Sequence, residues 1–164
     1  MSSLLRALLL SLALLAPGVS LSANPPNILL ANVYRNQADV AQYLVSEKLD
    51  GVRALWDGQT LRFRSGKEIH APRWFVEGLP KQSLDGELWL GRGSFERLSG
   101  IVRRDLPDDA EWRQVRYMVF ELPGAAGTFR ERAGQIKQVV RQANVPWLQE
   151  MQQFTAVDRN NLHK

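Results

Sequence analysis

The pattern of apolar and polar positions predicts a chain built mainly of short strands. Residues 52–56 and 60–64 are rich in strand-forming residues, and the Asp57-Gly58 pair between them is typical of a tight hairpin turn. Further strands are expected at residues 43–48, 83–90, 115–122 and 154–157, because each contains a short apolar run. Strands joined by such short turns pair in the antiparallel direction.

Three segments carry the signals of helices. Residues 73–77 follow Pro72, which suits the first turn of a helix, and Ser94 is a good N-cap for a second helix. Apolar residues of that second helix recur at helical spacing: Phe95, Leu98, Ile101 and Val102. Thr128 and Glu131 match a capping box that opens a third helix running to about residue 143. We therefore expect an α+β fold with mostly antiparallel sheets flanked by helices.

Residues 1–23 are interpreted as a signal peptide rather than as part of the fold. Arg6 precedes an apolar run at residues 7–16, Pro17-Gly18 breaks the run, and small residues then offer a cleavage site. The run is too short to span a bilayer comfortably. We expect a mature domain at residues 24–164, located in the periplasm, without stable membrane association after the signal is removed.

Composition limits the chemistry that the chain can perform. The absence of cysteine excludes disulfides and thiolate metal sites, and the length suits one packed domain, which we expect to be a monomer. The 21 Lys and Arg residues outnumber the 17 Asp and Glu residues. This mild excess suits a polyanion partner without establishing one.

One segment combines groups that support chemistry on a phosphate: Ser46-Glu47-Lys48-Leu49-Asp50-Gly51-Val52-Arg53. A lysine amine can attack phosphorus once neighbouring cations and burial have lowered its pKa. The segment resembles the K-x-D-G-x-R motif of ATP-dependent DNA ligases and of the related RNA-ligase and capping enzymes. The resemblance implies that Lys48 is the catalytic nucleophile and that Glu47 and Arg53 bind the nucleotide. From the residues alone, Arg53 either binds phosphate or pairs with a carboxylate on a neighbouring strand.

Three further segments resemble parts of the same family, in the same order along the chain. Arg64-Ser65-Gly66 lies where the ligases carry an arginine that contacts the nucleotide or the nicked strand. Residues 84–89 resemble the D-G-E motif, whose glutamate, here Glu87, binds the ribose or helps to hold a metal ion. Residues 115–123 resemble the segment whose aromatic residue, here Phe120, stacks on the adenine. An aromatic residue within an apolar strand is otherwise usually a core residue.

Residues 91–104 resemble the corresponding stretch of the small exported bacterial ligases. A glycine loop, a helix N-terminus and arginines suit contact with a phosphate backbone, so Arg92, Arg103 and Arg104 are predicted to bind DNA. An ordinary solvated helix face is the alternative interpretation of this segment.

The resemblance implies a reaction as well as a fold. Lys48 would attack the α-phosphorus of ATP with Mg²⁺ assistance and form a lysyl-AMP, and the AMP would move to the 5′-phosphate of nicked duplex DNA. Attack by the 3′-hydroxyl would seal the strand. The fold implied is the nucleotidyltransferase (ATP-grasp-like) domain of the ligases.

The chain departs from the family pattern in two respects. Glu121 stands where most members carry aspartate, and a longer carboxylate could shift a metal or ribose contact. The sequence also lacks the family's E-G and K-x-K motifs and its OB-fold, so we expect self-adenylation to be severely impaired. The alternatives are an RNA ligase or capping-type nucleotidyltransferase, and a truncated, non-catalytic remnant that at most binds nucleic acid.

Overall fold

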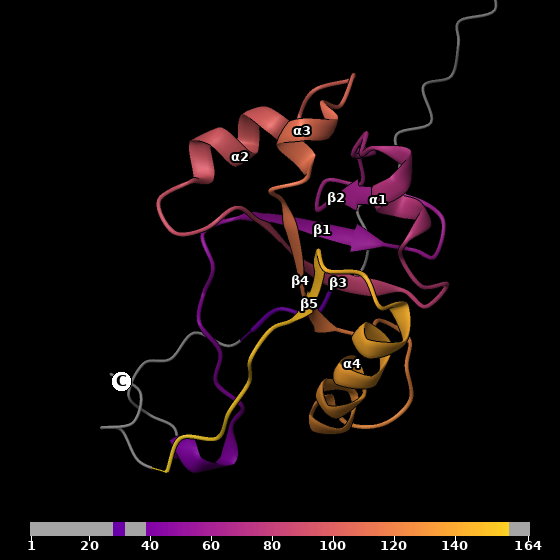
Figure 1. The fold of residues 1–164 in the computed structure, drawn as a ribbon. Helices are drawn as coiled ribbons and strands as arrows, with labels where there is room; N and C mark the ends of the chain where they lie inside the picture. The colour runs from indigo at the N-terminus through magenta and orange to yellow at the C-terminus, as the bar shows by residue number, and fades with distance from the viewer. Residues whose placement is uncertain (1–27, 32–38, 158–164) are drawn as a thin grey trace, which may run out of the picture.

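A computed structural model describes residues 28–31 and 39–157 (Figure 1). The predicted signal peptide, residues 1–23, lies outside the described residues. A short 3-10 helix, η1, at Val40–Gln42 precedes nine further elements in the described part of the chain. In chain order these are β1 (Val52–Trp56), β2 (Leu61–Phe63), α1 (Arg73–Glu77), β3 (Leu84–Trp89), α2 (Phe95–Val102), α3 (Asp109–Trp112), β4 (Arg116–Glu121), α4 (Phe129–Ala143) and β5 (Leu148–Glu150).

The strands form one five-stranded sheet in the order β2-β1-β3-β4-β5. The pairs β1–β2, β1–β3 and β3–β4 are antiparallel, which confirms the predicted α+β class. β5 instead pairs with β4 in the parallel direction, because α4 carries the chain back to the starting end of β4. α2 packs against β1 and β3, and α4 packs against β4 and β5. In Figure 1, α2 and α3 lie at the top of the view and α4 at the lower right.

Two predicted strands are wrong. Residues 43–48 and 154–157 contribute only an isolated bridge between Val45 and Phe154, although both were expected to be strands. After α4 the structure shows a different strand, the three-residue β5. The sequence pattern did not predict β5, because so short a run has almost no periodicity. The four-residue α3 was also missed; the Asp108 side chain caps it by accepting a hydrogen bond from the Glu111 backbone N–H at 2.9 Å.

The helices were predicted well where capping chemistry defines them. α4 begins at a capping box in which the Glu131 carboxylate accepts a hydrogen bond from the Thr128 backbone N–H at 2.6 Å. Ser94 occupies the N-cap position of α2 as expected, but its side chain makes no capping hydrogen bond. Within the described residues, no helix combines the length and apolar character needed to cross a membrane.

One face of the sheet packs against the helices and forms the hydrophobic core. Alternate strand residues point into it, and they include Val52, Ala54, Leu84, Leu88, Tyr117, Val119 and Leu148. The Tyr117 hydroxyl is fully buried and lies 2.9 Å from the Ala54 carbonyl oxygen and 3.1 Å from that of Leu84. This hydrogen bonding ties β4 to β1 and β3 across the sheet. The residues between these core-facing positions on β1, β3 and β4 point to the opposite face of the sheet.

Glu121 belongs to the helix-covered side of the sheet. The Arg132 guanidinium of α4 donates to both carboxylate oxygens, Nε at 2.7 Å and Nη2 at 2.6 Å, and the Leu122 N–H donates at 2.7 Å. Burial favours a raised pKa for this carboxyl, but the hydrogen bonds from Arg132 and Leu122 outweigh it and lower the pKa. Glu121 therefore joins β4 to α4.

A glycine in the middle of α4 offers a test of helix energetics. Gly134 is exposed, and a Cβ added there would meet no atom within 4 Å. Gly134→Ala is therefore expected to raise the free energy of unfolding by about 0.5–1 kcal/mol, because alanine loses less backbone entropy in a helix. Urea denaturation measures the change. Gly86→Ala is the opposite case, since its Cβ would lie 2.4 Å from the Met118 carbonyl oxygen, and it should destabilise the protein.

Candidate active site

Four of the residues that carry the site lie on the sheet face opposite the core. Arg53 comes from β1, Asp85 and Glu87 from β3, and Phe120 from β4. The β1–β3 register sets Arg53 opposite Glu87. Because side chains alternate along a strand, this register places the charged groups together on one face.

Arg53 is held by a buried carboxylate. Its Nε lies 3.0 Å from Asp85 Oδ1 and its Nη2 lies 2.6 Å from Oδ2, a bidentate pair. The Nη2 group also donates to the Leu29 carbonyl oxygen at 2.8 Å. Of the two roles open from sequence, pairing with a carboxylate on a neighbouring strand is therefore the one that the structure shows.

Asp85 is a site residue that sequence reasoning missed. Only 1% of its surface is exposed, so its charge depends on Arg53 for compensation. Burial raises the pKa of Asp85 above its ordinary value, while hydrogen bonds and charge from Arg53 oppose the increase. The available signal was an aspartate within the apolar strand predicted at residues 83–90, where an ionised side chain needs a partner.

Phe120 lies beside Arg53 and outside the main core. The Arg53 Cζ is 5.2 Å from the centroid of the Phe120 ring, a cation–π distance. Phe120 is half-buried, unlike its neighbours Val119 and Glu121, which are buried on the helix side. The structure thus brings together Arg53 and Phe120, two of the residues predicted to bind the nucleotide.

Glu87 lies close to the loop that carries Lys48. A Cβ at Gly51 would lie 2.6 Å from Glu87 Cγ and 2.3 Å from the Leu88 carbonyl oxygen, so only glycine lets this loop approach β3 so closely. Burial raises the pKa of Glu87 to about 7. The Gly51 backbone N–H and the charges of Arg53 and Lys48 oppose this increase. Lys48 and Glu87, predicted separately, therefore act on each other electrostatically.

The raised pKa of Glu87 predicts a pH effect on stability. A carboxyl whose pKa is about 7 in the folded protein, against 4.5 ordinarily, holds its proton more tightly when folded. Its contribution to stability is complete below pH 4.5 and is lost as the pH rises through 7. After allowance for partial exposure, we expect wild type to lose about 1–3 kcal/mol relative to Glu87→Gln over this window. Urea denaturation of both proteins at several pH values measures the difference; parallel curves would contradict the assignment.

Glu47 and Arg92 bind each other, although they were predicted to bind nucleotide and DNA respectively. Arg92 Nε donates to Glu47 Oε1 and Arg92 Nη2 to Oε2, both at 2.9 Å. The side chains are 82% and 48% exposed for Arg92 and Glu47. An ion pair this exposed contributes at most about 1 kcal/mol, so either partner can exchange it for a phosphate or a cation.

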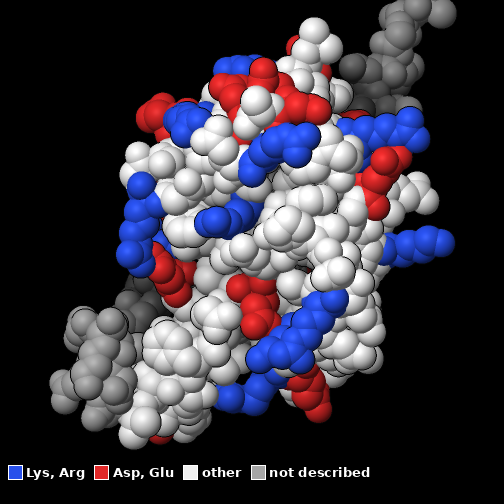
Figure 2. Space-filling view, viewed as in Figure 1, with Lys and Arg blue, Asp and Glu red and all other residues white. Residues whose placement is uncertain are grey.

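The remaining predicted arginines lie outside this cluster. Arg64 is exposed just after β2, and its side chain has no hydrogen bond or ion pair with the residues that the structure describes. Arg103 donates to Ser99 Oγ at 2.8 Å, and Arg104 forms an ion pair with Glu111. Figure 2 shows basic and acidic side chains interspersed over the side of the molecule in view, without one continuous basic surface. The DNA-binding assignments of Arg92, Arg103 and Arg104 stay predictions.

No group of three or more His, Cys, Asp or Glu side chains in residues 28–31 and 39–157 could hold a metal ion. Asp85 is paired with Arg53, and Glu87 is a second carboxylate of the same sheet face, on which the charge of Lys48 acts. One carboxylate suits Mg²⁺ that arrives with a nucleotide, because this ion is commonly held by one or two carboxylates together with substrate phosphates.

Comparisons with known proteins identify DNA ligases as similar to this chain. No family model matches the chain. A DNA ligase of Haemophilus influenzae is 30% identical over 138 residues, which are 84% of this chain and 50% of the relative. A solved structure described in a study of Lig E DNA ligases, with DNA binding on a minimal scaffold, is 40% identical with a TM-score of 0.77. That match covers 84% of this chain and 55% of the other.

A more distant structure extends the likeness of the fold. The Chlorella virus DNA ligase-adenylate has 16% sequence identity and a TM-score of 0.62, over 80% of this chain and 51% of that one. The chain thus spans about half the length of the proteins that it matches. Each of these matches covers most of this chain, whose Arg53, Glu87 and Phe120 lie on one face of the sheet.

Proposed function

We propose that this chain, a relative of the ATP-dependent DNA ligases as the motif around Lys48 predicted, performs their nucleotidyl transfer. Lys48 Nζ attacks the α-phosphorus of ATP, the bond to pyrophosphate breaks, and a lysyl-AMP forms. The AMP then passes to the 5′-phosphate at a nick in duplex DNA, and the 3′-hydroxyl displaces it to seal the strand. The observation that carries the proposal is the gathering of Arg53, Glu87 and Phe120 on one sheet face, with the charge of Lys48 acting on Glu87.

The side chains at this face suit separate parts of the task. Lys48 must lose its proton before its amine attacks phosphorus. Phe120 offers an aromatic surface for the adenine, and Glu87 offers a carboxylate for a ribose hydroxyl or for Mg²⁺. When bound, Mg²⁺ would neutralise charge on the triphosphate. Arg53 is fixed by Asp85, so its orientation is set before the nucleotide arrives.

The proposed DNA partner is nicked duplex, bound by a monomer. Arg64 is exposed, and the exposed pair between Arg92 and Glu47 opens at little cost, so both arginines are available for phosphates. Arg103 and Arg104 would first have to leave Ser99 and Glu111.

The proposed location of the mature chain is the periplasm, to which residues 1–23 would direct it. The support is the apolar run after Arg6 and the small residues that follow Pro17-Gly18. N-terminal sequencing of the chain recovered from the periplasmic fraction tests the proposal, with a start at Asn24 expected. A chain that stays in the cytoplasm with its first residues intact would contradict it.

Labelling with ATP tests the first step of the proposed reaction. The full chain is incubated with Mg²⁺ and ATP labelled on the α-phosphate, and the protein is denatured before the label is counted. Tryptic peptides are then analysed by mass spectrometry, and an AMP adduct on the peptide containing Lys48 is the expected result. A folded chain that binds ATP but carries no adduct, or carries it on another lysine, would contradict the proposal.

A further inference from the structure

The outer face of α4 carries cations without acidic partners. Gly134, Lys137, Gln138, Arg141 and Gln142 recur at the spacing of one helical face, and all five are exposed. They line a shallow hollow of about 410 Å³. Neither Lys137 nor Arg141 forms an ion pair with any residue of the described part of the chain. We name these five residues the α4 stripe.

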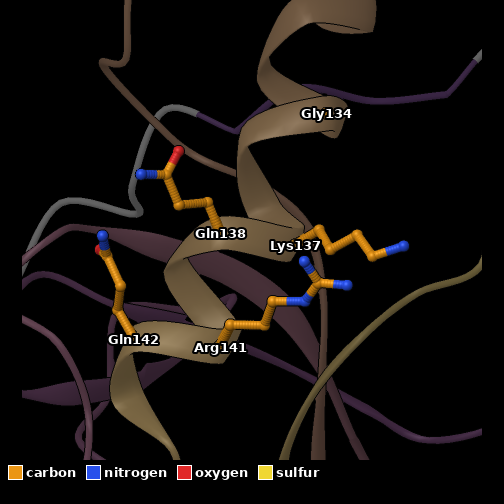
Figure 3. A pocket seen from close by; sticks show the side chains of 5 residues that line it. All are labelled: Gly134, Lys137, Gln138, Arg141 and Gln142. Atoms are coloured by element: carbon orange, nitrogen blue, oxygen red, sulfur yellow. The ribbon is translucent and has the colours of Figure 1, made fainter.

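The two cations of the α4 stripe lie side by side. Figure 3 shows Lys137 and Arg141 extending to the same side of the helix, with Gln138 and Gln142 on the other side. Like charges four residues apart destabilise a helix slightly, and no carboxylate of α4 relieves them. The acidic residue of α4, Glu131, is instead engaged at the capping box with Thr128.

We propose that the α4 stripe binds the phosphate backbone of duplex nucleic acid, at a surface separate from the nucleotide site. Arginine, lysine and glutamine are all residue types that contact phosphate and sugar in such complexes. Lys137 and Arg141 are separated by about 6 Å along the helix axis, over which one DNA strand presents about two phosphates. Gly134 removes a side chain from the same face, which lets a backbone approach closely.

The position of α4 makes this a second surface. α4 packs on the core face of β4 and β5 through Ile136, whereas Arg53 and Phe120 lie on the opposite face. A duplex segment on the α4 stripe is therefore distinct from the one whose phosphate would react. The stripe lacks the Trp, Phe and Leu residues that an interfacial membrane helix inserts, so its chemistry favours nucleic acid over a lipid surface.

A salt series with intact duplex tests the proposal. Binding of an unnicked duplex of about two helical turns is measured at several salt concentrations for wild type and Lys137→Gln/Arg141→Gln. Each phosphate contact contributes about 0.9 to the slope of log K against log salt, so the double variant should lose about 1.8. The matched control is Lys81→Gln/Arg113→Gln, which removes two exposed cations outside α4 and should leave the slope unchanged.

A second variant and two further measurements keep the test decisive. Gly134→Glu places a carboxylate one turn before Lys137 and should weaken duplex binding without removing a cation. Formation of the lysyl-AMP should be unchanged in every variant, which separates this proposal from the nucleotidyl transfer itself. An equal loss of slope in the control, no loss in the double variant, or binding to phosphatidylglycerol vesicles in place of duplex would overturn it.

Discussion

Lys48→Arg is expected to form no lysyl-AMP, although it retains the positive charge. The guanidinium stays protonated at any pH that the protein survives, so it has no free electron pair with which to attack phosphorus. A lysine amine that has lost its proton, in contrast, carries a free electron pair and can act as a nucleophile. The measurement is the labelling with α-phosphate-labelled ATP, made on the variant and on wild type in parallel.

Two controls separate chemistry from binding in Lys48→Arg. Equilibrium dialysis should show that the variant still binds ATP, because the charge next to Glu87 is kept. Lys81→Arg, at an exposed lysine away from the site, should label like wild type. Label on Lys48→Arg at the wild-type level would show that another group is the nucleophile and would remove Lys48 from the mechanism.

The sequence predicted best the elements that local chemistry determines. The capping box at Thr128 and Glu131 is sufficient to start α4, and the two halves of the β1–β2 hairpin follow from their residue types. β5 could not be predicted, because its parallel pairing depends on where α4 delivers the chain. Val45 and Phe154 likewise bond to each other only once the whole sheet is in place.

Some residues of the candidate site were predictable from sequence motifs, whereas the pairing of others depends on the register of the strands. The motifs identified Lys48, Glu87 and Phe120 as site residues, and the structure places them around the same sheet face. The partner of Arg53 was not predictable, because β1 and β3 are separated by β2 and α1 and only their register brings Asp85 to the guanidinium. The pairing of Glu47 with Arg92 also joins segments far apart in sequence.

Arg53→Met is expected to lower the free energy of unfolding by about 3–5 kcal/mol, because it leaves the buried carboxylate of Asp85 without a partner. Arg132→Met is a matched control on the core face, because it leaves the buried carboxylate of Glu121 without its partner. A loss of similar size is expected. Urea denaturation compares the two variants. Only Arg53→Met should also weaken ATP binding in the protein that remains folded, since Arg132 lies on the other side of the sheet.

Removing both charges distinguishes the structural role of Arg53 from its role at the site. Arg53→Met/Asp85→Leu replaces the pair by apolar side chains, and such replacements are often neutral or stabilising because no buried charge is left unpaired. The double variant should therefore recover most of the stability lost in Arg53→Met, while ATP binding and lysyl-AMP formation stay impaired. Recovery of both stability and ATP binding would show that Arg53 acts only as the counter-ion of Asp85, and that the nucleotide is held by Lys48, Glu87 and Phe120 without it.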